Sequence, residues 1–147
     1  MLKAMKDLFL KLPKNEDDLV TVSDDLWKLG GINEIKEKVT FELFIAHICI
    51  NIVGNHQSDG WGSILLYNTE IIPYIPQALD ALSLPEIKGE FYKVLDWLST
   101  FEQGQIPDNF YEHIEELDNL SDLEWGLGAE KRGWGGILSY ISDNYNF

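Results

Sequence analysis

The stretch at residues 32–55, INEIKEKVTFELFIAHICINIVGN, carries the clearest periodic pattern in the chain. Its apolar residues recur at a spacing near 3.6, the period of an α-helix, at Ile32, Ile35, Val39, Leu43, Ile45, Ile48 and Ile52. Gly54 and Asn55 follow, and residues of these types commonly end a helix. The pattern predicts either one long helix over residues 32–53 or two helices with a break near Thr40.

Similar patterns on both sides of this stretch predict further helices. Capping residues or prolines stand before apolar runs at Ser23-Asp24-Asp25, Ser58-Asp59, Thr69-Glu70, Leu84-Pro85 and Ile106-Pro107-Asp108, and a last helix is expected from about Trp134 to Tyr145. Gly30-Gly31 is expected to end the first of them. We therefore expect an all-α fold: a single compact domain over residues 1–147, with about seven or eight helices, short connecting loops and little or no β-structure.

Length and composition agree with a soluble globular protein. The chain has 147 residues, of which 45% are hydrophobic and 24% are charged. Its one cysteine, Cys49, excludes a disulfide framework. No apolar run approaches the ~20 residues that cross a bilayer, so we expect a cytoplasmic protein that does not enter the membrane. Residues 1–12 are basic and amphipathic, and we interpret them as a first helix docked on the core.

Two octets of the sequence resemble each other. Residues 60–67 read GWGSILLY and residues 133–140 read GWGGILSY. Glycine next to tryptophan lets a backbone approach the indole closely, and the Ile, Leu and Tyr that follow continue one apolar face. We interpret both octets as packing elements, and a duplication and a coincidence both remain open as their origin.

Few residues of the sequence stand in arrangements that are typical of catalytic or metal-binding sites. Nucleotide-binding glycine motifs, a nucleophile elbow and paired metal-binding histidines are all missing. His47 and Cys49, in an apolar helix, are expected to be core residues, whereas His56 is placed in a loop between helices. We expect no catalytic residue, no metal site and no cofactor. The less favoured alternative is an enzyme whose pocket wall is the loop at residues 55–68.

Charge is the most informative feature. The chain has 25 Asp and Glu against 11 Lys and Arg, giving a net charge of −14. Residues 94–130 contain no Lys or Arg. In the helix predicted to start at Pro107, four acidic residues at i, i+4, i+7 and i+8 share one face, where like charges repel. Such a face is either solubilising or a surface that binds a basic partner. The candidate partner-binding residues are Asp108, Glu112, Glu115, Glu116, Asp118, Asp122 and Glu124.

The stretch from about Phe41 to Leu98 resembles a bacterial domain family of largely unknown function that includes DNA-mimic proteins. The residues that carry the resemblance are Asn55-His-Gln-Ser-Asp-Gly60-Trp61, Ile64-Leu-Leu-Tyr-Asn68 and Gln77-Ala-Leu-Asp-Ala-Leu82. Trp61 stands where the family has Phe, and Ser63 stands where Gln is usual. The turn residues of the motif are Asn55, Asp59, Gly60, Trp61 and Asn68. The resemblance implies an all-α fold and an acidic surface that sequesters a DNA-binding protein.

Together these observations favour a non-enzymatic acidic protein-binding module. In the first version, the acidic face acts as a DNA mimic and occupies the basic groove of a DNA-binding protein. In the alternative, the protein is an immunity or antitoxin-like protein that neutralises a basic toxin. Both versions require a basic protein as partner, with no direct contact to nucleic acid. The oligomeric state is left open.

Overall fold

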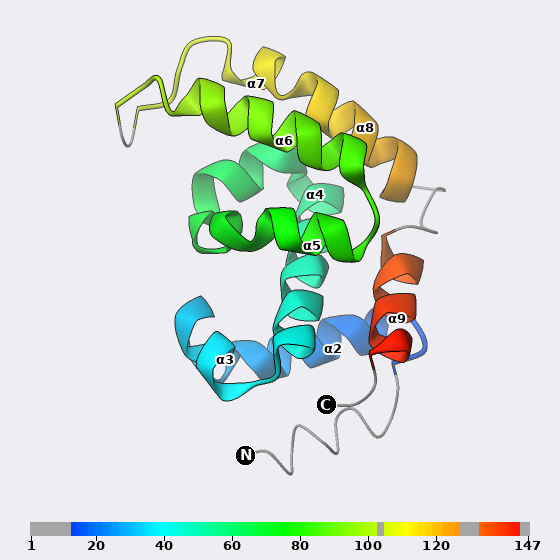
Figure 1. The fold of residues 1–147 in the computed structure, drawn as a ribbon. Coiled ribbons are helices and arrows are strands. Elements are labelled where there is room, and N and C mark those ends of the chain that lie inside the picture. Colours follow the sequence, from blue (N-terminus) through cyan, green and yellow to red (C-terminus); the bar gives the residue numbers. More distant parts are fainter. Residues whose placement is uncertain (1–12, 103–104, 127–132, 145–147) are drawn as a thin grey trace.

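The fold is all-α, as predicted. A computed structural model describes residues 13–102, 105–126 and 133–144 (Figure 1). Within these ranges it has eight α-helices, one 3₁₀ helix and no strand: α2 (Glu16–Trp27), α3 (Ile32–Lys38), α4 (Phe41–Tyr67), η1 (Thr69–Tyr74), α5 (Ile75–Ala81), α6 (Pro85–Leu98), α7 (Phe110–His113), α8 (Glu115–Trp125) and α9 (Trp134–Asp143). The helix predicted over residues 1–12 lies outside the described residues.

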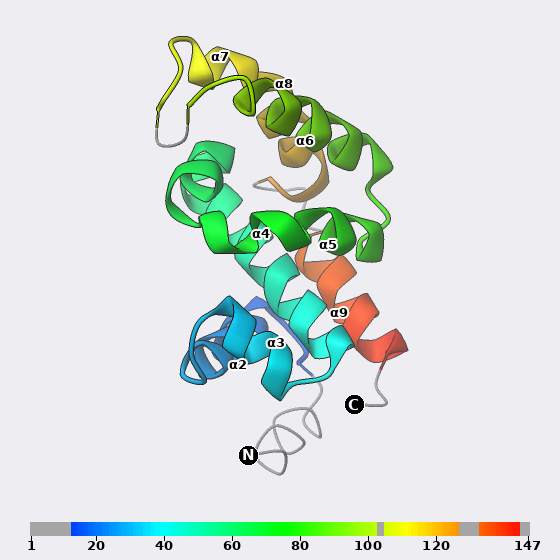
Figure 2. The same ribbon diagram turned by 60° about the vertical axis from the view of Figure 1, so that its left-hand side comes forward.

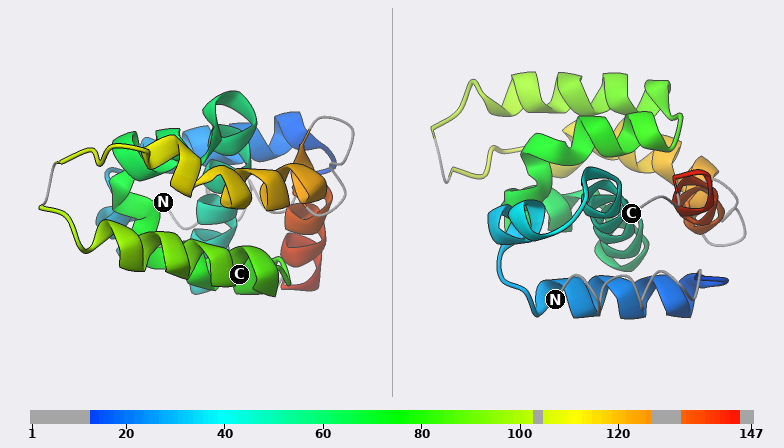
Figure 3. Two further views of the ribbon diagram at one scale, coloured as in Figure 1. Left: turned by 90° about the horizontal axis from the view of Figure 1, so that it is seen from above. Right: turned by 60° about the horizontal axis from the view of Figure 1, so that its bottom comes forward.

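Helix α4 is the centre of the molecule. It contacts α2, η1, α5, α8 and α9, and most of its residues between Leu43 and Leu65 are buried. Figures 1 and 2 show α2 and α3 at one end of α4 and the layer of α6, α7 and α8 at the other. In Figure 3, α6 and α8 run side by side across this second end, in agreement with their direct contact. None of the described helices is both long and apolar enough to cross a membrane.

The 32–55 pattern corresponds to two helices, which confirms the break near Thr40. The Thr40 side chain caps α4 by accepting a hydrogen bond from the backbone N–H of Leu43 at 3.3 Å. The predicted helix end at Gly54-Asn55 is wrong, because α4 continues to Tyr67. The Trp134 indole packs beside Gly54, where an added Cβ would lie 3.6 Å from the ring. This contact from α9 compensates for the low helix propensity of glycine.

Two other predicted helix starts are wrong. Helix α2 begins at Glu16 rather than at Ser23, because the Asn15 side chain caps it by accepting from the Asp18 N–H. The predicted end near Gly30 is confirmed, and Gly30 has a φ of 131°. The predicted continuous helix from Pro107 is also wrong: its residues form the short α7 and then α8, separated at Ile114. The starts predicted at Pro85 and Trp134 are confirmed.

The two octets occupy equivalent local positions, which confirms them as packing elements. In each, the first glycine precedes a helical segment whose first residue is a buried tryptophan, 0% exposed at Trp61 and 4% exposed at Trp134. Gly60 bends α4 and has φ 75° and ψ −178°. Only glycine adopts this backbone region without strain. The kink at Gly60 therefore depends on the absence of a side chain there.

Replacing Gly60 tests this dependence. We expect Gly60→Ala to lower the free energy of unfolding by about 1–3 kcal/mol, the strain of placing a side chain in this region. Gly89→Ala, in the interior of α6 with nothing within 4 Å of the added methyl group, should instead raise it by about 0.5–1 kcal/mol. Urea unfolding measures both changes. Equal stabilities for the two variants would contradict this account of the kink.

Candidate functional site

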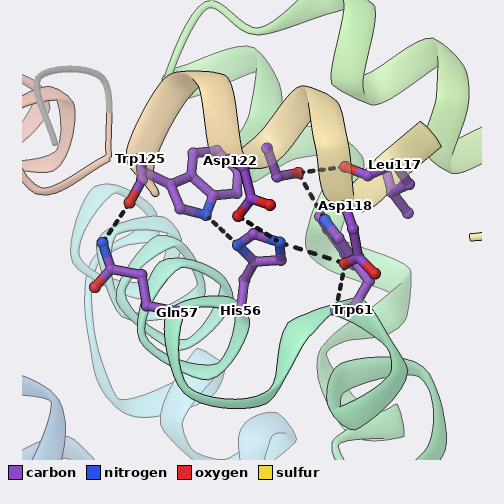
Figure 4. Close-up of polar contacts among 8 residues, drawn as sticks. His56, Gln57, Trp61, Leu117, Asp118, Asp122 and Trp125 are labelled. Atoms are coloured by element: carbon purple, nitrogen blue, oxygen red, sulfur yellow. Dashed lines mark hydrogen bonds and ion pairs between the residues drawn. The ribbon is translucent and has the colours of Figure 1, made fainter. Parts of the chain in front are cut away.

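A buried imidazole joins α4 to α8 just before the kink. His56 is 5% exposed, and its Nδ1 accepts a hydrogen bond from the Trp125 indole Nε1–H at 2.8 Å (Figure 4). Because an indole nitrogen only donates, Nδ1 of the neutral imidazole carries no proton. His56 Nε2 therefore carries the proton and points it at Asp118 Oδ1, 3.3 Å away. Trp125 thus selects the tautomer of His56.

The Asp118 carboxylate connects the two parts of α4. Its Oδ1 also accepts a hydrogen bond from the backbone N–H of Trp61, at 2.9 Å. This N–H follows the kink directly, so Asp118 caps the second part of α4 from another helix, as a side chain at an N-cap would. An added Cβ on Gly60 would lie 3.4 Å from Asp118 Oδ1, an ordinary van der Waals contact, so the backbone conformation with φ 75° is what requires glycine here.

Further hydrogen bonds between side chains surround this contact. The Trp61 indole Nε1 donates to Ser121 Oγ at 2.7 Å, and Ser121 Oγ donates to the Leu117 carbonyl at 2.8 Å. Gln57 donates through Nε2 to the Trp125 carbonyl and accepts through Oε1 from the Trp134 indole Nε1 at 2.9 Å. These contacts, most of them drawn in Figure 4, tie α4, α8 and α9 together.

The loop predicted at His56 is wrong, and with it the pocket wall at residues 55–68, whereas the helical segment predicted after Ser58-Asp59 is present as the part of α4 that follows Gly60. Residues 55–67 belong to α4, and Asn68 is its C-cap residue, with its N–H bonded to the Ile64 carbonyl. Asn55 is half-buried within the helix, whereas Asp59 is exposed. His56 is buried rather than placed at an open pocket wall. The loop is expected from the sequence because Gly54-Asn55 is typical of a helix end and Ser58-Asp59 of a helix start. Contacts from α8 and α9 to this segment accompany its helical conformation.

The structure brings together two sets of residues that were predicted separately. Gly60 and Trp61, from the motif that resembles the family, lie against Asp118, from the acidic set. Asp122 lies one helical turn further along α8, with its Oδ1 3.9 Å from His56 Nε2 and its side chain 65% exposed. Asp118 therefore has a packing role, with 31% of its side chain exposed, while Asp122 stays open to solvent.

The other predicted acidic residues are four exposed side chains and the half-buried Glu124. Asp108, Glu112, Glu115 and Glu116 are exposed, and among the described residues none of them pairs with a lysine or arginine. They do not lie on one continuous helix, since Asp108 precedes α7 and Ile114 separates α7 from α8. Glu124 is half-buried and lines a hollow of about 320 Å³ with Leu84, Pro85 and Ile87.

A second set of buried polar side chains surrounds His47. His47 is fully buried, as predicted, and its Nδ1 lies 3.0 Å from Ser23 Oγ. Asn51 donates to the same hydroxyl at 3.3 Å, so the Ser23 hydroxyl is hydrogen-bonded to both Asn51 and His47. His47 Nε2, however, finds no hydrogen-bond partner within the described part of the chain. Burial lowers the pKa of His47 from 6.5 to about 4. Ser23 and His47 are both closed to solvent, so this pair cannot meet a substrate.

The remaining candidate residues also have packing roles. Cys49 is fully buried, its Sγ lies 3.6 Å from the Ala78 carbonyl, and burial raises the pKa of the thiol far above its usual value. This agrees with the prediction that Cys49 is a small core residue. His113 stacks on the Trp97 ring, with centroids 3.9 Å apart. Among the residues the structure describes, no three His, Cys, Asp or Glu side chains form a group that could hold a metal ion.

Comparison with protein-family models, with curated proteins and with solved structures yields no match to this chain. The resemblance to the family that includes DNA mimics therefore stays a prediction, and the geometry of the chain itself must carry any proposal about function.

The role of Asp118 can be tested against Asp122, its neighbour on α8. We expect Asp118→Ala to lower the free energy of unfolding by about 1–3 kcal/mol, because the Trp61 N–H and the His56 Nε2–H lose their acceptor. Asp122→Ala should change it by less than about 0.5 kcal/mol, because Asp122 is largely exposed. Urea unfolding measures both variants, and nitrogen NMR of the imidazole should show His56 protonated at Nε2 at pH 8. A proton at Nδ1 would contradict the assignment.

The buried His47 predicts a specific pH dependence. The unfolded chain takes up a proton near pH 6.5, whereas folded His47 stays neutral down to about pH 4. This contribution to stability is therefore complete above pH 6.5 and declines as the pH falls to about 4, by up to about 3 kcal/mol. Urea unfolding of the protein and of His47→Gln between pH 8 and 4 should show a smaller decline in the variant. NMR titration of His47 near pH 6.5 would refute this expectation.

Proposed function

We propose that this protein is a non-enzymatic binding module that engages a basic protein through α7, α8 and the turn before them. We call the exposed carboxylates of this region, Asp108, Glu112, Glu115, Glu116 and Asp122, the acidic surface. The observation that carries the proposal is that no lysine or arginine of the described chain neutralises any of these side chains. The described lysines that form ion pairs do so elsewhere, with Asp25, Glu34, Asp80 and Glu90.

Part of this charge has a local explanation. Glu115 and Glu116 lie in the first turn of α8, where the positive end of the helix dipole favours carboxylates by about 0.3–1 kcal/mol each. Glu112 lies in the preceding short helix, and Asp122 lies near the C-terminal end of α8, where the dipole disfavours a negative charge. A basic partner would relieve the mutual repulsion of the whole set.

The contact between α4 and α8 supports the proposal by fixing the position of the acidic surface. The hydrogen bonds of Asp118, Ser121 and Trp125 join α8 to α4 at successive turns. A surface held in this way loses little conformational entropy when a partner binds. The buried polar network thus contributes to binding without touching the partner.

Two versions of the partner follow from the same surface. Carboxylates spaced along α7 and α8 resemble the charge of a DNA backbone, and the family resemblance favours a DNA-binding protein as partner. The exposed side chains of Tyr111 and Leu123, 68% and 74% exposed, favour the alternative. They offer apolar contacts of the kind that an immunity protein makes with one toxin.

Charge-neutralising variants test the proposal. A tagged protein with Glu112→Gln, Glu115→Gln and Glu116→Gln should lose capture of basic proteins from a host lysate, because the Coulomb attraction falls. The matched control carries Glu16→Gln, Asp17→Asn and Asp24→Asn on α2, which remove the same charge from exposed positions elsewhere, and it should retain capture. Capture is measured by mass spectrometry after elution with salt and then with duplex DNA.

The outcomes separate the versions. Release of a basic protein by duplex DNA supports the DNA-mimic version, and retention of one partner despite DNA supports the immunity version. Equal capture by the two variants, or binding that is unchanged at ~1 M salt, where the screening length is ~3 Å, would contradict a binding role for the acidic surface.

A further inference from the structure

Helix α7 carries a tyrosine that is mostly exposed although part of its ring lies against α4. Tyr111 is 68% exposed although it stands next to the buried Phe110. Its ring lies against α4, where a Cβ on Gly62 would be only 2.9 Å from Tyr111 Cε1. The Phe110 ring meets it edge-on at a centroid distance of 5.2 Å. Tyr111 is thus held from two sides while most of its surface faces solvent.

The charges near Tyr111 are all of one sign. Asp108, Glu112 and Glu115 lie within four residues of it in the sequence and are exposed. Residues 94–130 supply no lysine or arginine to pair with them. In the described part of the chain, the one ring with a cation above it is Tyr74, whose centroid lies 4.9 Å from Lys36 Nζ. Tyr111 therefore presents a ring to solvent, with carboxylates close to it in the sequence and, among the residues that the structure describes, no cation above the ring.

This combination suits a planar cation. An arginine guanidinium stacks on an aromatic ring and donates two parallel hydrogen bonds to a carboxylate at the same time. A lysine ammonium is a compact charge that keeps its hydration shell more strongly, and it gains less from a ring. Tyr67, at the end of α4, is also an exposed aromatic side chain, at 84%, and Glu70 is the nearest acidic residue to it in the sequence.

We propose that Tyr111 and its neighbouring carboxylates form a docking point for an arginine side chain of a basic partner protein. This inference rests on the proposed function and adds that the acidic surface prefers arginine over lysine. Selectivity arises because the carboxylates attract both side chains, whereas the ring adds stabilisation mainly for the guanidinium. The acidic surface is thereby specific for an arginine-bearing segment rather than for positive charge in general.

Two peptides of equal charge test the preference. Octa-arginine and octa-lysine are titrated into the full chain at 150 mM salt, and binding is followed by calorimetry and by the backbone NMR signals of α7 and α8. We expect octa-arginine to bind about two- to five-fold more tightly, the effect of one exposed cation–π contact. Tyr111→Leu, which keeps an apolar side chain against Gly62, should abolish the preference, and Tyr111→Phe should keep it. Tyr67→Leu is the matched control and should also keep it.

The charge variants show which of the two proposals fails. The docking point is wrong if the preference for arginine survives in Tyr111→Leu, or if the native chain binds both peptides equally. In either case the proposed function still stands if the variant with Glu112→Gln, Glu115→Gln and Glu116→Gln binds both peptides more weakly. If these three substitutions leave both affinities unchanged, and the NMR signals of α7 and α8 do not shift, the acidic surface itself is not a binding surface.

Discussion

The structure depends on one carboxylate that serves both sides of a bent helix. Asp118 Oδ1 accepts a hydrogen bond from the Trp61 backbone N–H and lies 3.3 Å from His56 Nε2. A bend in a helix leaves backbone N–H groups without intrahelical partners, and burying such a group is costly unless another group bonds it. Asp118 meets that requirement from α8, so the bend of α4 and the attachment of α8 form one interaction. The acidic surface on α7 and α8 is positioned by this attachment.

Three tryptophans form further hydrogen bonds between the same helices. The indole N–H groups of Trp61, Trp125 and Trp134 all donate to side chains at the contacts between α4, α8 and α9. Each indole also fills a buried volume, so packing and hydrogen bonding fix the same orientation. A buried polar network in which donors and acceptors are matched favours a single arrangement of the helices. This rigidity suits a protein that presents a fixed pattern of charge to a partner.

Lysines and carboxylates are unevenly distributed among the helices. Described lysines pair with carboxylates on or near α2, α3, α5 and α6, whereas residues 94–130 contain no lysine or arginine. The carboxylates on α7 and α8 therefore repel one another, which lowers the stability of the fold. The buried contacts of α8 with α4 offset this cost. In the same way, His47 is kept neutral within the core, at the expense of an Nε2 atom that has no partner among the described residues. Buried polar groups are thus matched closely at the contact of α4 with α8 and less completely at His47, in the first half of α4.

The sequence by itself determined the all-α fold, the helix starts at Thr40 and Pro85, the buried positions of His47 and Cys49, and the acidic character of residues 94–130. These features are local: a capping residue, a period of 3.6 and a count of charges act within a few residues. Only the tertiary structure decided that residues 55–59 continue α4, since Trp134 packs on Gly54 and Asp118 caps the chain after Gly60. The sequence placed Asp118 among the surface acids and His56 in a loop, because no local pattern shows that residues 62 positions apart will meet. Their roles arise from a contact between distant helices, and such contacts override local propensity when they satisfy buried polar groups.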